Sequence, residues 1–529
     1  MSSSGYAGYQ AGAFGQITVL GEGSTWHSVE SLDIGVDGSG ILEINGGGSV
    51  RTNAGRVGQN SGSMGQVTVN GLNSRWSVDE SLSVGNSGHG MLTISQGGAL
   101  RSQDTSVIGD APGSTGQVSV DGAGTNWELR GEFLVGREGI GSLTVSNGGY
   151  VMAGGNFTGI IGDVSGSSGV VMVDGSGSTL TNTGGLMVGR AGTGTLSISN
   201  RGTVSNQGHS RIGVDENSIG WVTVEGEGSV WNSSTLYAGI SGRGNVAIAE
   251  GGSVRSEGAY IGYEWGAVGD VTVSGANANW TTSNYGLYVG RGGNGTLNIT
   301  SGGEVSCSWG AIGSFSSSSG KVRIHGAGSK WNVRGVLDVG GDAMLNITDG
   351  GLLTVDYALT ISATPRHDNS IAMASGGMLA IPGDVDDSLT QFLGFVQGND
   401  AIRYWNPEDG HLASLTDATY GDDYTLEYLT TGDLAGYTML TVTAPGPTGD
   451  FDGDFDVDGG DFLAWQRGES PTALGAADLA DWQANFGAGA ASANALAATP
   501  EPSAALLAAL ALTLGMVSRA GQSRGRRRS

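Results

Sequence analysis

The chain has 529 residues, of which 100 are glycine, 14% are charged and 38% are hydrophobic. This composition excludes a disordered polyelectrolyte and a membrane-embedded bundle, and the high glycine content predicts many tight turns. The net charge of −26 argues against nucleic acid as a partner, because an acidic surface repels phosphate backbones. The single cysteine, Cys307, excludes an internal disulfide framework, and we expect it to be a small buried strand residue.

The first residues of the chain carry no recognisable export signal. Residues 1–14 contain no basic segment followed by an apolar stretch. Residues 6–15 align with residues 260–269, which close an internal repeat, so the printed sequence begins inside a repeat. Because the end of a solenoid needs a cap, we expect a signal peptide and a cap to precede Met1.

A motif of the form Gly-x-Val-x-Val recurs seven times at intervals of about 50 residues. A tryptophan follows each copy except the fourth, where Leu180 takes its place. Each unit contains two related halves of roughly 25 residues, and each half holds three short alternating strands separated by Gly, Ser, Asn and Asp turns. The copies begin at Gly15, Gly65, Gly116, Gly169, Gly220, Gly269 and Gly320.

Three strands in every half-unit predict an all-β fold, a right-handed parallel β-helix, over residues 5–363. A propeller or a sandwich also uses short strands at fixed spacing, but three strands per pass fit a three-sided coil better than a four-stranded blade. In such a coil Trp26 would alternate with Val50 and Trp76 in one internal ladder. We interpret the tryptophans as core packing, and we keep open the alternative of a sugar-stacking platform.

The series of residues 220–231, Gly-x-Val-x-Val-x-Gly-x-Gly-Ser-x-Trp, resembles the autotransporter-associated β-strand repeats of large bacterial surface proteins. This resemblance implies an exported structural or adhesive protein. The competing class is a β-helix enzyme that binds or degrades polysaccharide, which would need paired carboxylates or calcium beside a basic residue on one face. The six histidines occupy different repeat positions and the acidic residues stand alone, so we expect no enzyme.

The repeat pattern ends near Pro365, and residues 364–444 contain apolar and aromatic clusters with strand-like alternation. We expect this segment to form a β cap on the C-terminal end of the rod. Residues 445–449, Pro-Gly-Pro-Thr-Gly, are then a linker.

Residues 450–461 hold six aspartates in twelve positions. Carboxylates at positions 1, 3, 5, 9 and 12, with a backbone carbonyl at position 7, are typical of a loop that binds Ca²⁺. A solvated acidic linker is the alternative, but it would not also place Val457 at the apolar position 8 and a helix-like run at 462–466. The candidate metal ligands are Asp450, Asp452, Asp454, Asp456 through its carbonyl, Asp458 and Asp461.

Residues 450–487 resemble a dockerin-type calcium module, which implies a cohesin-like partner. Two departures are visible. The second half keeps only a weak echo of the first, at residues 478–483, which puts a second ion site in doubt. Phe455 stands at position 6, where the sharp turn favours glycine, so we expect a reduced affinity.

The last segment, residues 499–529, follows a short linker at 488–498 and contains Pro-Glu-Pro, an apolar run from Ala504 to Val517 and an arginine cluster. The apolar run alone could be a weak tail anchor with its arginines in the cytoplasm. The order of the three parts resembles the PEP-CTERM sorting signal. That resemblance implies an exosortase-type protease as a partner, transient membrane insertion, and delivery to the cell surface or beyond. The sorting-signal residues are Pro500, Glu501, Pro502, Arg526, Arg527 and Arg528.

Overall fold

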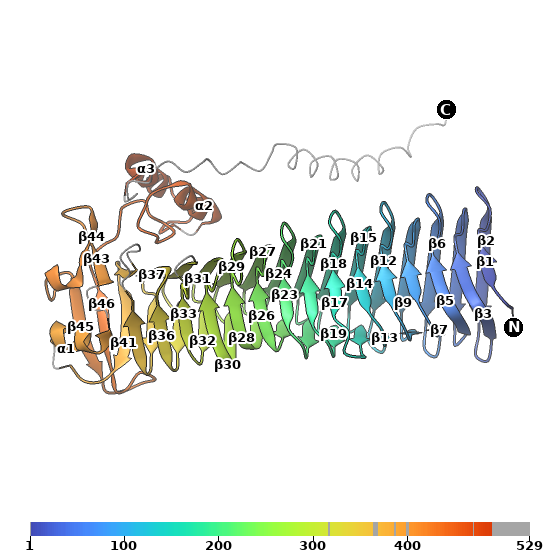
Figure 1. Cartoon of the computed structure of the whole chain (residues 1–529), viewed down its shortest axis with the longest axis horizontal. Coiled ribbons are helices and arrows are strands. Elements are labelled where there is room, and N and C mark those ends of the chain that lie inside the picture. The colour runs from blue at the N-terminus through green and yellow to red at the C-terminus, as the bar shows by residue number, and fades with distance from the viewer. Residues whose placement is uncertain are drawn as a thin grey trace, which may run out of the picture.

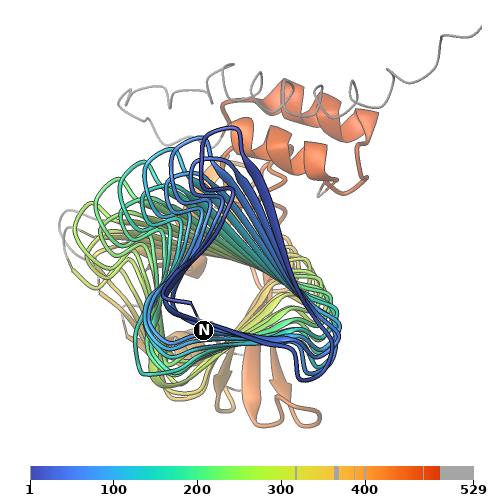
Figure 2. The ribbon, with the colours of Figure 1, turned by 90° about the vertical axis from the view of Figure 1, so that its right-hand side faces the viewer.

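The computed structural model describes residues 2–315, 318–362, 369–385, 388–397, 401–468 and 470–488. The main body is a parallel β-solenoid of about 15 turns, each of roughly 25 residues (Figure 1). Seen along the rod, successive turns superimpose around one core (Figure 2). The predicted parallel β-helix is confirmed, and the propeller and sandwich alternatives are excluded.

The first face of the rod is a ladder of parallel strands, most of which have seven residues. Alternate side chains point inward, so that Leu42 and Ile44 are fully buried and pair with Val67 and Val69 of the next turn. The strands of this face are β2 (Phe14–Leu20), β4 (Ser39–Asn45), β6 (Met64–Asn70), β9 (His89–Ser95), β12 (Thr115–Asp121), β15 (Ile140–Ser146), β18 (Ser168–Asp174), β21 (Thr193–Ser199), β24 (Ile219–Glu225), β27 (Arg243–Ala249), β29 (Val268–Ser274), β31 (Asn294–Thr300), β34 (Ser319–His325), β37 (Asp342–Thr348), β40 (Ser370–Met373) and β43 (Ile402–Asn406).

The second face carries the tryptophan ladder. Val50 pairs with Trp26 on one side and with Trp76 on the other, and Leu100 separates Trp76 from Trp127. Except for Trp26, which is half-buried, the ladder tryptophans are buried, so the packing interpretation is confirmed. The strands confined to this face are β7 (Arg75–Val78), β10 (Ala99–Ser102), β13 (Asn126–Leu129), β16 (Tyr150–Ala153), β19 (Thr179–Asn182), β22 (Thr203–Asn206), β25 (Val230–Asn232), β32 (Glu304–Cys307), β35 (Lys330–Val333), β38 (Leu352–Val355) and β41 (Gly377–Pro382).

Cys307 follows this pattern. Its side chain is buried at the end of β32, and burial raises the pKa of the thiol to about 12. The thiol is therefore protonated at neutral pH, as expected for a structural residue.

The third face is short, and most of its strands end in an apolar-Gly pair. Gly35 has φ of 72°, and a Cβ atom there would lie 2.2 Å from the carbonyl oxygen of Met64, so only glycine fits this corner. Its strands are β1 (Gly5–Ala7), β8 (Leu82–Val84), β11 (Ser106–Ile108), β14 (Phe133–Val135), β17 (Gly159–Ile161), β20 (Leu186–Val188), β23 (Ser210–Ile212), β26 (Thr235–Ala238), β33 (Gly310–Ile312), β36 (Val336–Val339), β39 (Ala358–Ile361) and β42 (Val396–Gln397). Four longer strands span faces two and three: β3 (Thr25–Ile34), β5 (Ser49–Val57), β28 (Ser253–Ile261) and β30 (Asn279–Val289).

The residue after this corner glycine forms ion pairs between neighbouring turns in the middle of the rod. Arg137 lies 2.6 Å from Asp110, and Arg190 lies 2.6 Å from Asp163. Parallel stacking places equivalent positions next to each other, so alternation of sign avoids like-charge contacts.

Antiparallel strands end the parallel ladder. On the second face β46 (Tyr437–Val442) pairs antiparallel with β41 and with β45 (Tyr424–Leu429), while on the first face β44 (His411–Ser414) pairs antiparallel with β43. These hairpins cover the open edge that the last parallel strands would otherwise expose. The short helices α1 (Leu389–Gly394) and η2 (Leu415–Asp417) lie in the same region.

Two further helices, α2 (Gly459–Arg467) and α3 (Ala476–Asn485), pack against each other beside the C-terminal part of the rod (Figure 1). Phe462 of α2 contacts Trp482 of α3 with 5.0 Å between ring centroids. None of the described helices is long and apolar enough to cross a bilayer.

Candidate metal centre

The acidic loop, residues 450–461, is folded by its own first carboxylate. Asp450 accepts hydrogen bonds from the backbone N–H groups of Gly453 at 2.7 Å, Asp454 at 3.2 Å and Phe455 at 3.0 Å. These hydrogen bonds fold the backbone of residues 453–455 around the carboxylate of Asp450, which is position 1 of the loop.

The last carboxylate closes the loop from the other side. Asp461 is fully buried and accepts from the backbone of Phe451 at 2.6 Å, Asp452 at 3.1 Å and Asp458 at 2.7 Å. Asp458 in turn accepts from Gly460 at 2.6 Å, so Asp458 and Asp461 form a capping box at the start of α2. The helix therefore fixes positions 9 and 12 of the loop.

The six predicted ligand residues all lie in this loop, in two groups of three. Asp450, Asp452 and Asp454 each offer an oxygen within 4.8 Å of the others, and so do Asp456, Asp458 and Asp461. Each group therefore brings three oxygens close enough together to hold a metal ion. Asp456, which we expected to contribute its carbonyl, brings its carboxylate into the second group.

The loop concentrates negative charge in a partly desolvated place. Burial raises the pKa of Asp450 well above its ordinary value, and the charges of Asp461 and Asp454 raise it further. Burial is also the largest cause of the raised pKa values of Asp452, Asp454 and Asp461. Burial and the neighbouring Asp454 raise the pKa of Asp456 to about 7. A bound cation would relieve all of these penalties.

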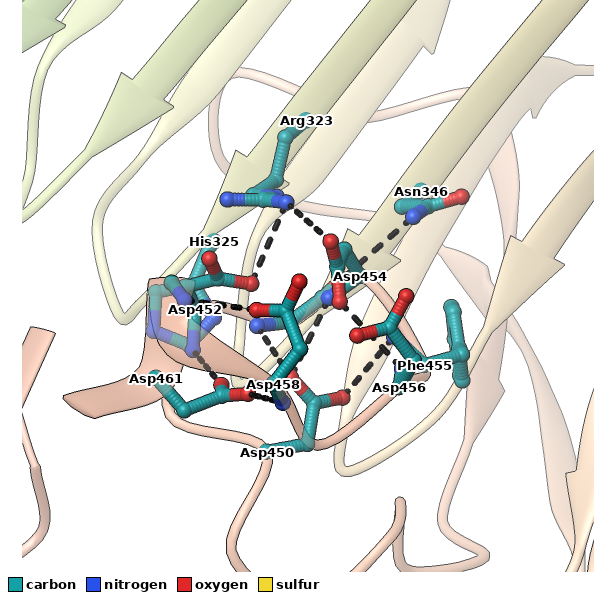
Figure 3. A network of polar contacts seen from close by, with 12 residues as sticks. Arg323, His325, Asn346, Asp450, Asp452, Asp454, Phe455, Asp456, Asp458 and Asp461 are labelled. Atoms are coloured by element: carbon teal, nitrogen blue, oxygen red, sulfur yellow. Dashed lines mark hydrogen bonds and ion pairs between the residues drawn. The ribbon is translucent and has the colours of Figure 1, made fainter. Parts of the chain in front are cut away.

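The loop contacts the rod through residues that the sequence analysis did not single out (Figure 3). One Nη atom of Arg323 lies 3.1 Å from a carboxylate oxygen of Asp452 and 3.1 Å from one of Asp454. The side-chain amide of Asn346 donates to the carbonyl of Gly453 at 3.4 Å.

Phe455 makes the apolar part of this contact. Its ring lies 6.1 Å from that of Trp405, at 24° between planes, and both rings are buried with Ala372 and Ala374. Phe455 has φ of 71°, a left-handed conformation that favours glycine. The phenylalanine at loop position 6 is thus explained by its contact with the cap.

The second half of the module supports the first. Trp482 donates from Nε1 to the carbonyl of Asp458 at 2.6 Å. Val457, fully buried at loop position 8, exchanges backbone hydrogen bonds with Gly487 and Ala488. Asp478 accepts from the backbone of Thr472 at 2.7 Å. This half therefore serves as packing for the acidic loop.

A polar groove runs along the second face near the cap. Two adjoining cavities of about 460 and 630 Å³ share Glu304, Ser306 and Lys330, and the segment between β45 and β46 walls one of them. Asn332 donates to Glu304 at 2.7 Å, and Tyr437 donates to Asp356 at 2.9 Å. Burial, with the contact from Asp356, raises the pKa of Tyr437 to about 12.

Aromatic side chains gather on the third face. Tyr237, Tyr260 and Tyr288 of three successive turns are stacked with ring centroids 5.0 and 4.8 Å apart. The guanidinium of Arg291 lies 4.6 Å from the ring centroid of Tyr263, which packs edge-on against Tyr237 and Tyr260. This half-exposed patch is a second surface whose composition differs from the rest of the rod.

The predicted sorting-signal residues, Pro500, Glu501, Pro502, Arg526, Arg527 and Arg528, lie outside the described residues. The apolar run that precedes the arginines lies outside them as well.

The architecture defines the chain as a member of the broad class of parallel β-solenoid proteins. A segment of 205 residues is 32% identical to the uncharacterized lipoprotein YdeK of Escherichia coli strain K12, and covers 36% of this chain and 14% of that protein. A segment of 131 residues is 34% identical to the adhesin BmaC autotransporter of Brucella suis biovar 1, and covers 23% of this chain and 4% of that protein. The chain thus matches only a small part of each relative. No family model matches the chain.

Proposed function

We propose that this chain is an exported, non-enzymatic β-helix protein that works at the bacterial cell surface as a structural or adhesive rod. The observation that carries the proposal is the uninterrupted solenoid, whose sequence is similar to segments of a lipoprotein and of an autotransporter adhesin. A rod of stacked turns suits a role that needs reach and an extended surface.

Two features of the surface support binding over catalysis. The carboxylates of the polar groove are engaged in hydrogen bonds with Asn332 and Tyr437, which suits a structural ladder. The aromatic patch presents half-exposed rings in the middle of a polar surface, and exposed apolar patches mark sites of interaction. Trp265 and Tyr285, which lie close in the sequence to Tyr263 and Tyr288 of this patch, are 82% and 57% exposed.

Surface delivery is assigned to the C-terminal PEP-CTERM-like signal, read by an exosortase-type protease after transient insertion in the inner membrane. The test is to replace Arg524, Arg526, Arg527 and Arg528 together by alanine in the native host. We expect unprocessed protein in the membrane fraction and loss of antibody labelling on intact cells, with the circular dichroism of the purified rod unchanged. Normal processing and labelling of this variant would refute the sorting proposal.

Calcium is proposed as the ligand of the acidic loop, held by Asp450, Asp452, Asp454, Asp458 and Asp461 with help from Asp456. Hard carboxylate oxygens at flexible distances favour Ca²⁺ over the smaller, strictly octahedral Mg²⁺. The raised pKa values of the loop support this assignment, because a site that penalises its own negative charge gains most from a cation.

The calcium test is calorimetric titration of the full chain. Asp461→Ala removes a ligand and leaves three backbone donors without their acceptor, so we expect the binding heat to disappear. Asp478→Ala is the matched control, because Asp478 is also a buried helix-start aspartate of the module but lies outside the loop. Absence of heat from the unaltered chain at millimolar calcium would refute the proposal.

A second candidate function is binding of polysaccharide along the groove, favoured by its row of amide, hydroxyl and charged side chains. Asn332→Ala should weaken retention on immobilised oligosaccharides, whereas Asn126→Ala, on the same face several turns away, should not. A cohesin-like protein remains the partner that the dockerin resemblance implies.

A further inference from the structure

The contact between the acidic loop and the rod rests on an arginine that interrupts the repeat. The outward position between the two apolar residues of the motif is threonine in four copies, Thr18, Thr68, Thr223 and Thr272, and serine or methionine in two others. Only in the seventh copy is it arginine, Arg323. Arg323 forms ion pairs with Asp452 and Asp454. The one copy of the motif that departs from the repeat pattern with an arginine is therefore the copy that contacts the acidic loop.

The guanidinium group leaves room for an ion. Asp452 presents Oδ1 to Arg323, and Asp454 presents Oδ2, so each carboxylate keeps a second oxygen outside the ion pair, and that of Asp454 also accepts from the backbone N–H of Asp456 at 3.2 Å. With Arg323 in place, Asp450, Asp452 and Asp454 still offer oxygens within 4.8 Å of one another. In Figure 3, Arg323 lies on one side of Asp452 and Asp454, and Asp450 and Asp461 lie on the other side, where a cation can be placed.

The other contacts fix the loop on the same part of the rod. Asn346, which is 3% exposed, stands next to Arg323 in the ladder and donates to Gly453. Phe455 inserts beside Trp405 of β43. The face of the loop that carries positions 3 to 6 is thus covered by the rod of its own chain.

We propose that the rod is the docking partner of the calcium module, and that Arg323 is a positioning residue that holds Asp452 and Asp454 for the ion. The inference rests on the proposed calcium function. Partners that orient ligating carboxylates contribute strongly to metal affinity. Because Arg323 orders the two carboxylates that the ion needs, docking favours calcium binding, and by linkage calcium binding favours docking to the same extent.

The first arm of the test measures calcium affinity of the full chain by calorimetry. Arg323→Thr installs the residue that four other copies carry, so the rod should fold normally. We expect its Kd for calcium to rise roughly ten- to hundredfold. Arg323→Lys keeps the charge but shortens the side chain and removes the planar guanidinium, so its Kd should lie between those of the unaltered chain and of Arg323→Thr. Arg190→Thr, which breaks another Arg–Asp pair of the rod, should bind calcium like the unaltered chain.

The second arm measures docking directly. Cys307 is buried, so spin labels can be placed on Glu216→Cys in the rod and Ala484→Cys in α3, both at exposed positions. Double electron–electron resonance should give a narrow distance distribution with calcium, and a broad one with a chelator or in the Arg323→Thr background.

The outcomes separate the two proposals. If the unaltered chain binds calcium but Arg323→Thr binds it equally well with the same narrow distances, the coupling is refuted and the calcium function stands. If the unaltered chain binds no calcium, both fail.

Discussion

The rod and the acidic loop are stabilised in opposite ways. Each turn of the rod has nearly the same neighbour above and below, so Trp127 packs between Leu100 and Val151 much as Trp76 packs between Val50 and Leu100. The acidic loop is held by contacts that each occur once in the molecule, and apart from the packing of Phe455 on Trp405 they are mostly polar. Repetition spreads stability over many equivalent apolar contacts, whereas the loop depends on single contacts and on charge neutralisation.

The largest expected effect is in the rod. Trp127→Ala removes a fully buried indole whose Nε1 donates to Ser102, and should destabilise the surrounding turns by about 3–5 kcal/mol. Each turn of a solenoid contacts only the turns next to it. Faster hydrogen exchange should therefore be confined to the turns around Trp127.

The matched control is Trp221→Ala on the first face. Trp221 is 50% exposed, so the same truncation should change stability by less than about 0.5 kcal/mol. Equal destabilisation by the two substitutions would contradict the assignment of the ladder tryptophans to the core.

A smaller effect is expected in the loop, as a pH dependence of the calcium-free chain. The folded-state pKa of Asp456 is about 7, above the ordinary pKa of 3.8, so the folded loop binds this proton more tightly than the unfolded loop. Stability of the calcium-free loop is therefore highest below pH 4 and is lost as the pH rises toward 7. Since Asp456 is partly solvated, we expect only about a tenfold increase in hydrogen exchange over this range.

The measurement is hydrogen exchange of residues 450–461 in a chelator, corrected for the intrinsic effect of pH. Saturating calcium should abolish the trend, because the ion replaces the proton as the neutralising charge. Strand β15 of the rod serves as the internal reference. A loop that becomes better protected as the pH rises in the chelator would contradict the raised pKa.

The smallest effect concerns loop position 6. Phe455→Gly and Phe455→Ala both remove the contact with Trp405, and both should broaden the distance between rod and module. The two variants differ in the energy of the backbone at this position. Its left-handed conformation is less favourable for alanine than for glycine by about 1 kcal/mol. Thermal unfolding of the module should therefore occur at lower temperature in the alanine variant, and identical midpoints would argue against strain at this residue.

The repeats made the fold predictable. The motif spacing predicted three strands per turn, the alternation of Trp76 with Val50 and Leu100, and a buried Cys307. These predictions succeeded because the same sequence pattern occurs in several copies. The clustering of the six aspartates was equally visible, since they lie at fixed spacing in one short segment.

The docking of the loop could not be derived from periodicity, because Arg323 and Asp454 are far apart in the chain and meet only once. Two signals were nevertheless present. Arg323 occupies a position that is threonine in most copies, and Phe455 occupies a turn position that favours glycine. A residue that breaks a local rule in this way indicates a partner elsewhere in the fold.

The tryptophan ladder also constrains how such a rod can change in length. Removing one turn between Trp76 and Trp127 would set indole against indole, in a space shaped for an indole beside an aliphatic side chain. Gene duplication and loss should therefore add or delete turns in pairs, each step of about 10 Å. Within the repeats an exception is the stretch Val151, Leu180 and Val204, where no tryptophan intervenes. There an odd number of turns can be inserted without a clash, so this stretch is where the parity of the rod is free to shift.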